Sequence, residues 1–163
     1  MSTSTYDLPN KSPRVLKTIF WGGLIAGILD ITGACIVAWL RAGVAPVRVL
    51  QSVAAGLYGP ASATLGAKTA AIGLVVHFFI ATVWTAVYYA ASRKLTFLIS
   101  QPLIFGILYG VIVYSFMNFV VIPVSAIPKR ATPPPLSGRL IGLAVIIFCI
   151  GIPIAFIVRK FSK

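Results

Sequence analysis

Carboxylate side chains are nearly absent from this sequence, because Asp7 and Asp30 are its only acidic residues. Charged residues of both signs make up 10% of the chain, whereas a soluble domain typically carries about 25%. Asp7 falls in a polar N-terminal stretch and Asp30 in an apolar one, so no paired carboxylates for acid–base catalysis are evident. The shortage of charge indicates that lipid, not water, surrounds most of the chain.

Histidine and cysteine are equally scarce. His77 is the only histidine, and Cys35 and Cys149 lack the spacing of a metal or redox motif. A lone histidine supplies a single axial ligand, so haem is not expected. The sequences HExxH, GxSxG and the Walker-type loop are missing too. We therefore predict no enzymatic activity and no cofactor or metal, and we expect both cysteines to pack as small apolar residues.

Apolar residues dominate instead, at 59% of the chain with a mean hydropathy of +1.00. They form four runs, each within the 17–25 residues that cross a hydrocarbon core. The runs are 18–40, 69–91, 103–122 and 140–158. Because backbone amides in lipid need internal partners, these lengths predict helices. The prediction is an all-α integral membrane four-helix bundle: a single domain over 18–158, a cytoplasmic tail over 1–17 and a basic C-terminal tail over 159–163.

The fourteen lysines and arginines all lie outside these runs. Such a distribution is typical of anchors that reach for lipid phosphates. We therefore expect the lipid bilayer, and no nucleic acid, as the partner of the basic residues. Eight of the fourteen fall on the side that holds both termini, so the positive-inside rule predicts cytoplasmic N- and C-termini.

The connections between the runs carry signals of their own. In 41–68, Pro46 and apolar residues spaced by three and four predict a short helix that ends at Gly59. This helix either lies in the membrane interface or packs over the mouth of the bundle. The third connection, which we take to include Pro123, is rich in proline and is expected to be stiff and extended. Pro153 predicts a kink in the fourth helix.

Pairs of glycines four positions apart occur three times, a spacing that allows close packing of helices in lipid. Gly23 and Gly27 share a helical face with Asp30 and Ala34, so the Asp30 carboxyl is expected to point at a partner helix. The candidate packing residues are Gly23, Gly27, Gly106, Gly110, Gly138 and Gly142.

Four polar residues within the runs form a candidate intramembrane site. They are Asp30, His77, Tyr114 and Asn118. With the orientation above, three of the predicted helices bring them together in the outer half of the bundle. One hypothesis is that they cross-link helices through hydrogen bonds of about 0.6 kcal/mol each. The other is that Asp30 and His77 form a titratable pair on a proton or solute path.

Three stretches resemble a group of uncharacterised bacterial inner-membrane proteins with four helices, of the YagU-like kind. The stretches are GLIAGILDITGA (23–34), HFFIATVWTAVYYAASRKL (77–95) and GILYGVIVYSFMNFVVIPVSA (106–126). The resemblance implies a bacterial multi-pass inner-membrane protein, and it carries no defined activity with it.

Two functions follow as hypotheses. The first is a structural or accessory membrane protein that associates with itself through its glycine faces or joins a larger membrane complex. The alternative is a small proton-linked transporter or channel that uses Asp30 and His77.

Overall fold

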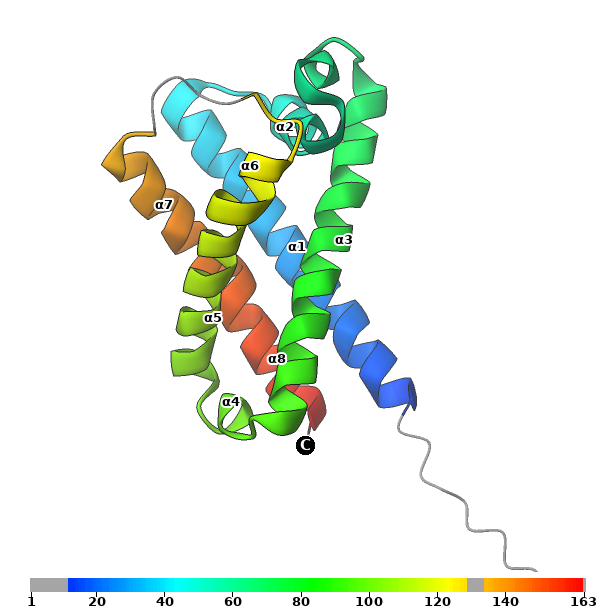
Figure 1. Cartoon of the computed structure of the whole chain (residues 1–163), viewed down its shortest axis with the longest axis vertical. Helices are drawn as coiled ribbons and strands as arrows, with labels where there is room; N and C mark the ends of the chain where they lie inside the picture. Colours follow the sequence, from blue (N-terminus) through cyan, green and yellow to red (C-terminus); the bar gives the residue numbers. More distant parts are fainter. Residues whose placement is uncertain (1–11, 129–133, 163) are drawn as a thin grey trace, which may run out of the picture.

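The computed structural model describes residues 12–128 and 134–162. Within this part the chain is helical, and four segments are long and apolar enough to cross a membrane (Figure 1). They are Arg14–Ala42, Ala67–Lys94, Pro102–Val124 and Leu136–Ser162. The prediction of an all-α bundle of four spans is confirmed, and the chain is a multi-pass membrane protein with four candidate spans.

The first two spans are single helices, whereas the last two are composite. The first half of the chain contains α1 (Ser12–Ala42), α2 (Pro46–Tyr58), the 3-10 segment η1 (Gly59–Ala63) and α3 (Ala67–Lys94). The third span follows α4 (Phe97–Ser100) and comprises α5 (Pro102–Phe116), η2 (Met117–Val121) and α6 (Ile122–Val124). The fourth comprises α7 (Leu136–Ile146), η3 (Ile147–Gly151) and α8 (Ile152–Ser162).

Two predicted boundaries need correction. Residues 12–17 and 159–162, predicted to belong to the tails, are helical, because a helix continues past the apolar core into the polar interface. Pro13 fits the first turn of α1, where no intrahelical N–H donor is required. The rest of the predicted N-terminal tail, 1–11, lies outside the described residues.

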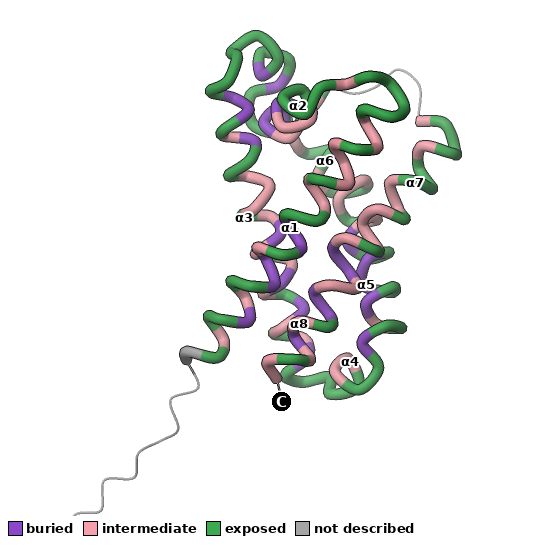
Figure 2. Tube along the Cα trace, turned by 180° about the vertical axis from the view of Figure 1, so that it is seen from behind, coloured by how far each residue is buried: buried purple, intermediate pink, exposed green. Residues whose placement is uncertain are grey.

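Large apolar side chains face outward along the spans. Val75, Phe79, Phe119 and Phe148 are each about two-thirds exposed or more. Figure 2 shows that buried stretches of the tube lie where helices meet, and that exposed stretches run along their outer sides. An outward apolar surface of this extent is the surface that contacts the lipid bilayer.

Glycines bring α1 against α3. A Cβ atom placed on Gly23 would lie 2.5 Å from Thr82 Oγ1, and one on Gly27 would lie 2.6 Å from the Phe78 ring. The absence of side chains at these positions is therefore what permits the observed approach of the two helices.

A second glycine contact joins α5 to the fourth span. A Cβ on Gly106 would lie 2.9 Å from Ile152 Cα, and one on Gly110 would lie 2.7 Å from Ile147 Cα. Gly138 and Gly142 are roomier, since the nearest atoms to their Cβ positions are at 3.7 and 3.4 Å. The four tightly packed glycines, Gly23, Gly27, Gly106 and Gly110, thus serve contacts within one chain.

The short helix α2 packs across the end of the bundle onto α3 (Figure 1). Gln51 and Ala55 are buried, while the apolar Leu57 and Tyr58 are exposed. The buried Gln51 side chain is satisfied, because its Nε2 donates to the Gly66 carbonyl at 2.9 Å. The helix therefore covers the bundle, as one of the two alternatives has it, and turns apolar side chains outward.

Both composite spans contain a π-helical segment about one turn before a proline. η2 precedes Pro123, and η3 precedes Pro153, where the sequence predicts a kink. A proline lacks the N–H donor and crowds the preceding turn, and a wider turn accommodates both effects. Pro123 lies in α6 and continues the third span, so assigning it to the connection was wrong. In that connection Pro135 is extended (φ −58°, ψ 152°), and 129–133 lie outside the described residues.

Candidate functional site

Asp30 lies near the middle of the first span and faces the bundle interior. Its side chain is 20% exposed, and Oδ2 lies 4.0 Å from Nε2 of His77, whose side chain is 11% exposed. The carboxyl therefore points away from lipid, as its helical face predicts. The two titratable groups come from α1 and α3, which the glycine contact holds together.

His77 makes its hydrogen bond to the backbone, not to Asp30. Its Nε2 lies 2.9 Å from the Gly27 carbonyl oxygen. Because a carbonyl only accepts, Nε2 carries the hydrogen in this arrangement. The separation of 4.0 Å from Asp30 exceeds hydrogen-bond length. His77 is thus a cross-link between two helices that also stands beside the carboxyl group.

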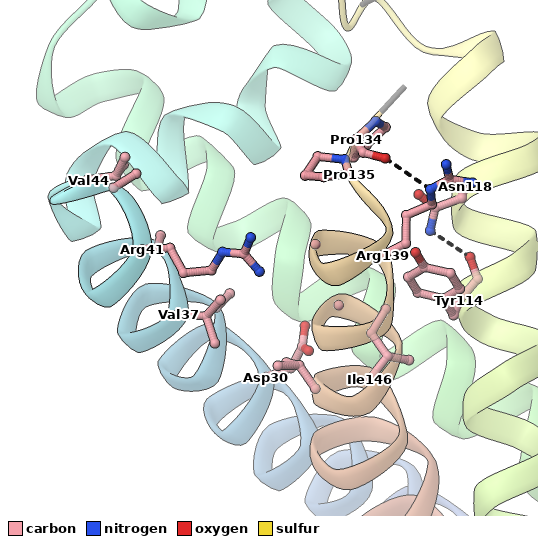
Figure 3. Close-up of a pocket in the computed structure, with 16 residues that line it drawn as sticks. Asp30, Val37, Arg41, Val44, Tyr114, Asn118, Pro134, Pro135, Arg139 and Ile146 are labelled. Carbon is pink, nitrogen blue, oxygen red and sulfur yellow. Dashed lines mark hydrogen bonds between the residues drawn. The ribbon is translucent and has the colours of Figure 1, made fainter. Parts of the chain in front are cut away.

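An open cavity of about 650 Å³ extends from Arg41 and Pro134 to Asp30 (Figure 3). Its arginine-lined part lies at the end of the bundle opposite the described chain ends (Figure 1). The cavity lies among α1, the third span and α7. The α1 and α7 walls carry small residues, including Ala34, Ala38, Gly138 and Gly142, which leave the space free. A cavity of this size falls within the range of roughly 300–1,000 Å³ typical of small-molecule sites.

Two arginines line the outer part of this cavity, one from α1 and one from α7 (Figure 3). Arg41 Nη2 donates to Ser137 Oγ at 3.4 Å, and Arg139 Nε donates to the Pro134 carbonyl at 3.0 Å. Within 12–128 and 134–162, Asp30 is the single carboxylate, and neither guanidinium pairs with it. The cavity therefore has a basic outer part and an acidic group at its inner end.

Tyr114 and Asn118 line the same cavity from the third span. Asn118 lies in η2 and donates from Nδ2 to the Tyr114 carbonyl at 2.8 Å (Figure 3). This bond stays within the helix, so Asn118 does not cross-link spans through it. Both side chains add polar groups between the arginines and Asp30.

A smaller cavity of about 190 Å³ lies on the other side of Asp30. It is lined by His77, Trp84, Met117 and Val53 among others, and Val53 belongs to α2. Asp30 borders both cavities. It shares the smaller one with His77 and the larger one with Tyr114 and Asn118. The other three predicted site residues thus lie around Asp30, divided between the two cavities, and the four do not form a single cluster.

Beyond Asp30, toward the described chain ends, the bundle is closed. The Tyr88 and Tyr109 rings lie 4.8 Å apart, and Tyr109 donates its hydroxyl hydrogen to the Trp84 carbonyl at 2.6 Å. Ile154 and Val158 of α8 are fully buried beside them. The molecule therefore has one open half and one packed half, and Asp30 lies between them.

The two cavity arginines were predicted to be bilayer anchors only. A signal for Arg41 was present, because it lies eleven residues after Asp30 and so returns to the same face of the helix after three turns. Arg139 had no such signal, since only the packing of α7 against α1 brings it to this cavity.

The described ranges contain no group of three or more His, Cys, Asp or Glu side chains that would hold a metal. Comparison with protein-family models, curated proteins and solved structures finds no match to this chain. The interpretation of the site therefore rests on its geometry, and the resemblance to YagU-like proteins stays a prediction.

Proposed function

We propose that this multi-pass protein is a small proton-linked transporter or channel, in which Asp30 binds and releases the proton. The observation that carries the proposal is the open cavity that ends at Asp30. We further propose that it resides in a bacterial inner membrane with cytoplasmic termini, so that the cavity opens to the outside, and that it is not an enzyme.

A carboxylate inside a membrane is energetically costly. An ionised Asp near the centre of a bilayer costs about 2.5–3.5 kcal/mol on insertion scales, so such residues face a protein interior or water. Asp30 borders two cavities, and His77 stands 4.0 Å away as a second titratable group. These features support a proton-binding site that water reaches from one side.

The closed half supports a transporter with alternating access in preference to an open channel. The Tyr88–Tyr109 contact and the buried α8 residues separate Asp30 from the side of the chain ends. The π-helical segments contribute Asn118 and Ile150 to the walls beside Asp30. Irregular turns of this kind frequently occur at functional sites, and they are the points at which the composite spans would bend.

A second candidate is the structural or accessory role. It is favoured by the bonding of the intramembrane polar groups, because His77, Tyr109 and Asn118 all donate to backbone carbonyls within the chain. Self-association would then need a surface other than Gly23, Gly27, Gly106 and Gly110, which pack internally.

Proton flux into liposomes separates the two functions. Purified protein is reconstituted with a pH-sensitive dye inside, and an external pH step is applied with and without a panel of small organic solutes. We expect solute-dependent proton flux in the native protein and none in Asp30→Asn. Thr32→Val, which removes a polar group from the exposed face of α1, serves as the matched control and should retain flux.

Thermal unfolding of the same samples shows whether each variant remains folded. If native protein and Asp30→Asn give identical flux while both are folded, Asp30 is not the proton carrier. If no flux occurs and Asp30→Asn changes only the melting temperature, the accessory function replaces the proposal.

A further inference from the structure

We infer that the larger cavity binds an anionic group, a carboxylate or a phosphate, between the guanidinium groups of Arg41 and Arg139. The inference rests on the proposed function and names its substrate class as small organic anions. It begins from the position of two arginines in a cavity wall, where bilayer anchors alone would be expected to face headgroups.

The two guanidinium groups approach the same region of the cavity from different spans. Arg41 Nη2 lies 3.4 Å from Ser137 Oγ and 3.9 Å from the Cβ position of Gly138, so it contacts the first turn of α7. Arg139 follows directly in that turn and is held by the Pro134 carbonyl. An anion between α1 and α7 would therefore meet both residues.

Most of the guanidinium donors have no acceptor among the described residues. Each arginine offers five N–H donors in a planar fork that matches a carboxylate or a phosphate. Among the described residues, the only acceptors are Pro134 for Arg139, at 3.0 Å, and Ser137 for Arg41, at 3.4 Å. The remaining donors are therefore available to a negative group from outside the described residues.

The N-terminus of α7 adds to the positive electrostatic potential that the two arginines create in the cavity. Its N-cap residue, Pro135, provides no side-chain cap, and the first turn contains no acidic residue. The unpaired N–H groups of a helix N-terminus favour negative charge. This effect supports the two arginines, whose charge and donor geometry carry the inference.

The distance to Asp30 sets the kind of ligand. Arg41 lies eleven residues from Asp30 along α1, roughly 16 Å at the helical rise. A ligand bound by its anionic group at the arginines can thus extend inward past Tyr114 and Asn118 before it reaches the carboxyl. The volume of about 650 Å³ accommodates such a molecule. A dissolved organic anion and the headgroup of an anionic lipid share this chemistry.

The test for a dissolved anion uses full-length protein in phosphatidylcholine nanodiscs, with inorganic phosphate and succinate as probes. Unfolding is followed by tryptophan fluorescence, since a ligand that binds only the folded state raises the melting temperature. We expect a saturable rise in native protein. Arg41→Gln and Arg139→Gln should each raise the apparent Kd at least about tenfold, because a charge-assisted contact is lost. Arg93→Gln, an exposed arginine in the last turn of α3, should match native protein.

The test for a lipid source replaces phosphatidylcholine with phosphatidylglycerol. A higher melting temperature in phosphatidylglycerol that both cavity-arginine variants lose, and Arg93→Gln keeps, would assign the anionic group to a lipid headgroup. Saturation by phosphate or succinate in phosphatidylcholine would assign it to a dissolved ligand. Either result supports the inference.

A cavity-filling variant covers the case in which an arginine variant fails to fold. Gly142→Leu keeps both arginines but places a side chain against Tyr114, whose ring lies 3.4 Å from the Cβ position. It should abolish the response to phosphate and succinate. The inference is overturned if native protein responds to none of the probes or lipids, or if Gly142→Leu and the folded arginine variants respond as native protein does.

The two proposals fail separately. Loss of Asp30-dependent proton flux with intact arginine-dependent binding would reject the transporter and retain the anion site. Asp30-dependent flux with unchanged binding in the arginine variants would retain the transporter and reject the anion site.

Discussion

Asp30 and His77 lie close together but have different local roles. His77 is fixed by the Gly27 carbonyl at 2.9 Å, whereas Asp30 borders two cavities. A histidine bound in this way fixes the distance between α1 and α3 at the depth of the acid. It leaves Asp30 free to interact with water or a ligand in the larger cavity.

Replacing His77 should therefore affect stability moderately. His77→Ala removes the contact with Gly27, and hydrogen bonds of this kind in membranes contribute about 0.6 kcal/mol on average and 1.7 at most. His77→Gln, which retains an N–H donor, should lose less. Unfolding in mixed detergent micelles measures the difference. A His77→Ala variant as stable as native protein would show that the bond contributes nothing.

At the scale of elements, glycine determines which helices become neighbours. The contact between α5 and η3 is very close, because Gly151 of η3 lies directly against the backbone of Gly106 and Gly110. A Cβ on Gly151 would overlap the Gly106 carbonyl oxygen and lie 2.7 Å from the Gly110 nitrogen. Backbone atoms cannot move aside as a flexible side chain can, so the helices would have to separate.

Gly151→Ala should consequently destabilise the bundle, by about 1–3 kcal/mol, which is typical of overpacking a tight contact. Gly138→Ala is the matched control, since its Cβ would meet nothing closer than 3.7 Å. Thermal unfolding of both variants in the same detergent makes the comparison. Equal melting temperatures would mean that the contact between α5 and η3 tolerates a methyl group.

At the scale of the whole molecule, the bundle is open on one side of Asp30 and packed on the other. The open side is bounded by α1, the third span and α7, with α2 over the adjacent end of α3. The packed side holds the aromatic contact and the buried face of α8. This asymmetry supports the proposed transporter, which would admit a ligand from one side of the membrane at a time.

Thiol labelling tests this arrangement in a variant that lacks Cys35 and Cys149. Ala34→Cys lines the cavity, Ile36→Cys lies on the exposed apolar face of α1, and Ala155→Cys is fully buried in α8. A water-soluble reagent added to the cavity side should label only the first. Labelling of Ala155→Cys at an equal rate would show that the packed half is open to water.

The number of spans and the face of Asp30 could be predicted because both depend on local properties. Hydropathy over about twenty residues reports transfer into lipid, and the helical period alone places Gly23, Gly27 and Asp30 together. Helix ends were less predictable. The first turn of α1 and the last turn of α8 extend into the interface, where apolar composition is not required. The four polar residues were predicted to come together, but the structure divides them between two cavities beside Asp30, and Asn118 bonds within its own helix. The helical period does not report how far apart side chains from different spans lie.

The sequence by itself determined that lipid surrounds this protein, that the chain has four membrane spans and that Asp30 faces the interior. Each of these follows from composition and from the helical period along a single helix. Tertiary structure alone decided that Arg139 of α7 joins Arg41 of α1 in one cavity, and that Tyr88 and Tyr109 close the other half. Those pairings depend on which helices pack together and at what distance, and the period along a single helix does not contain that information.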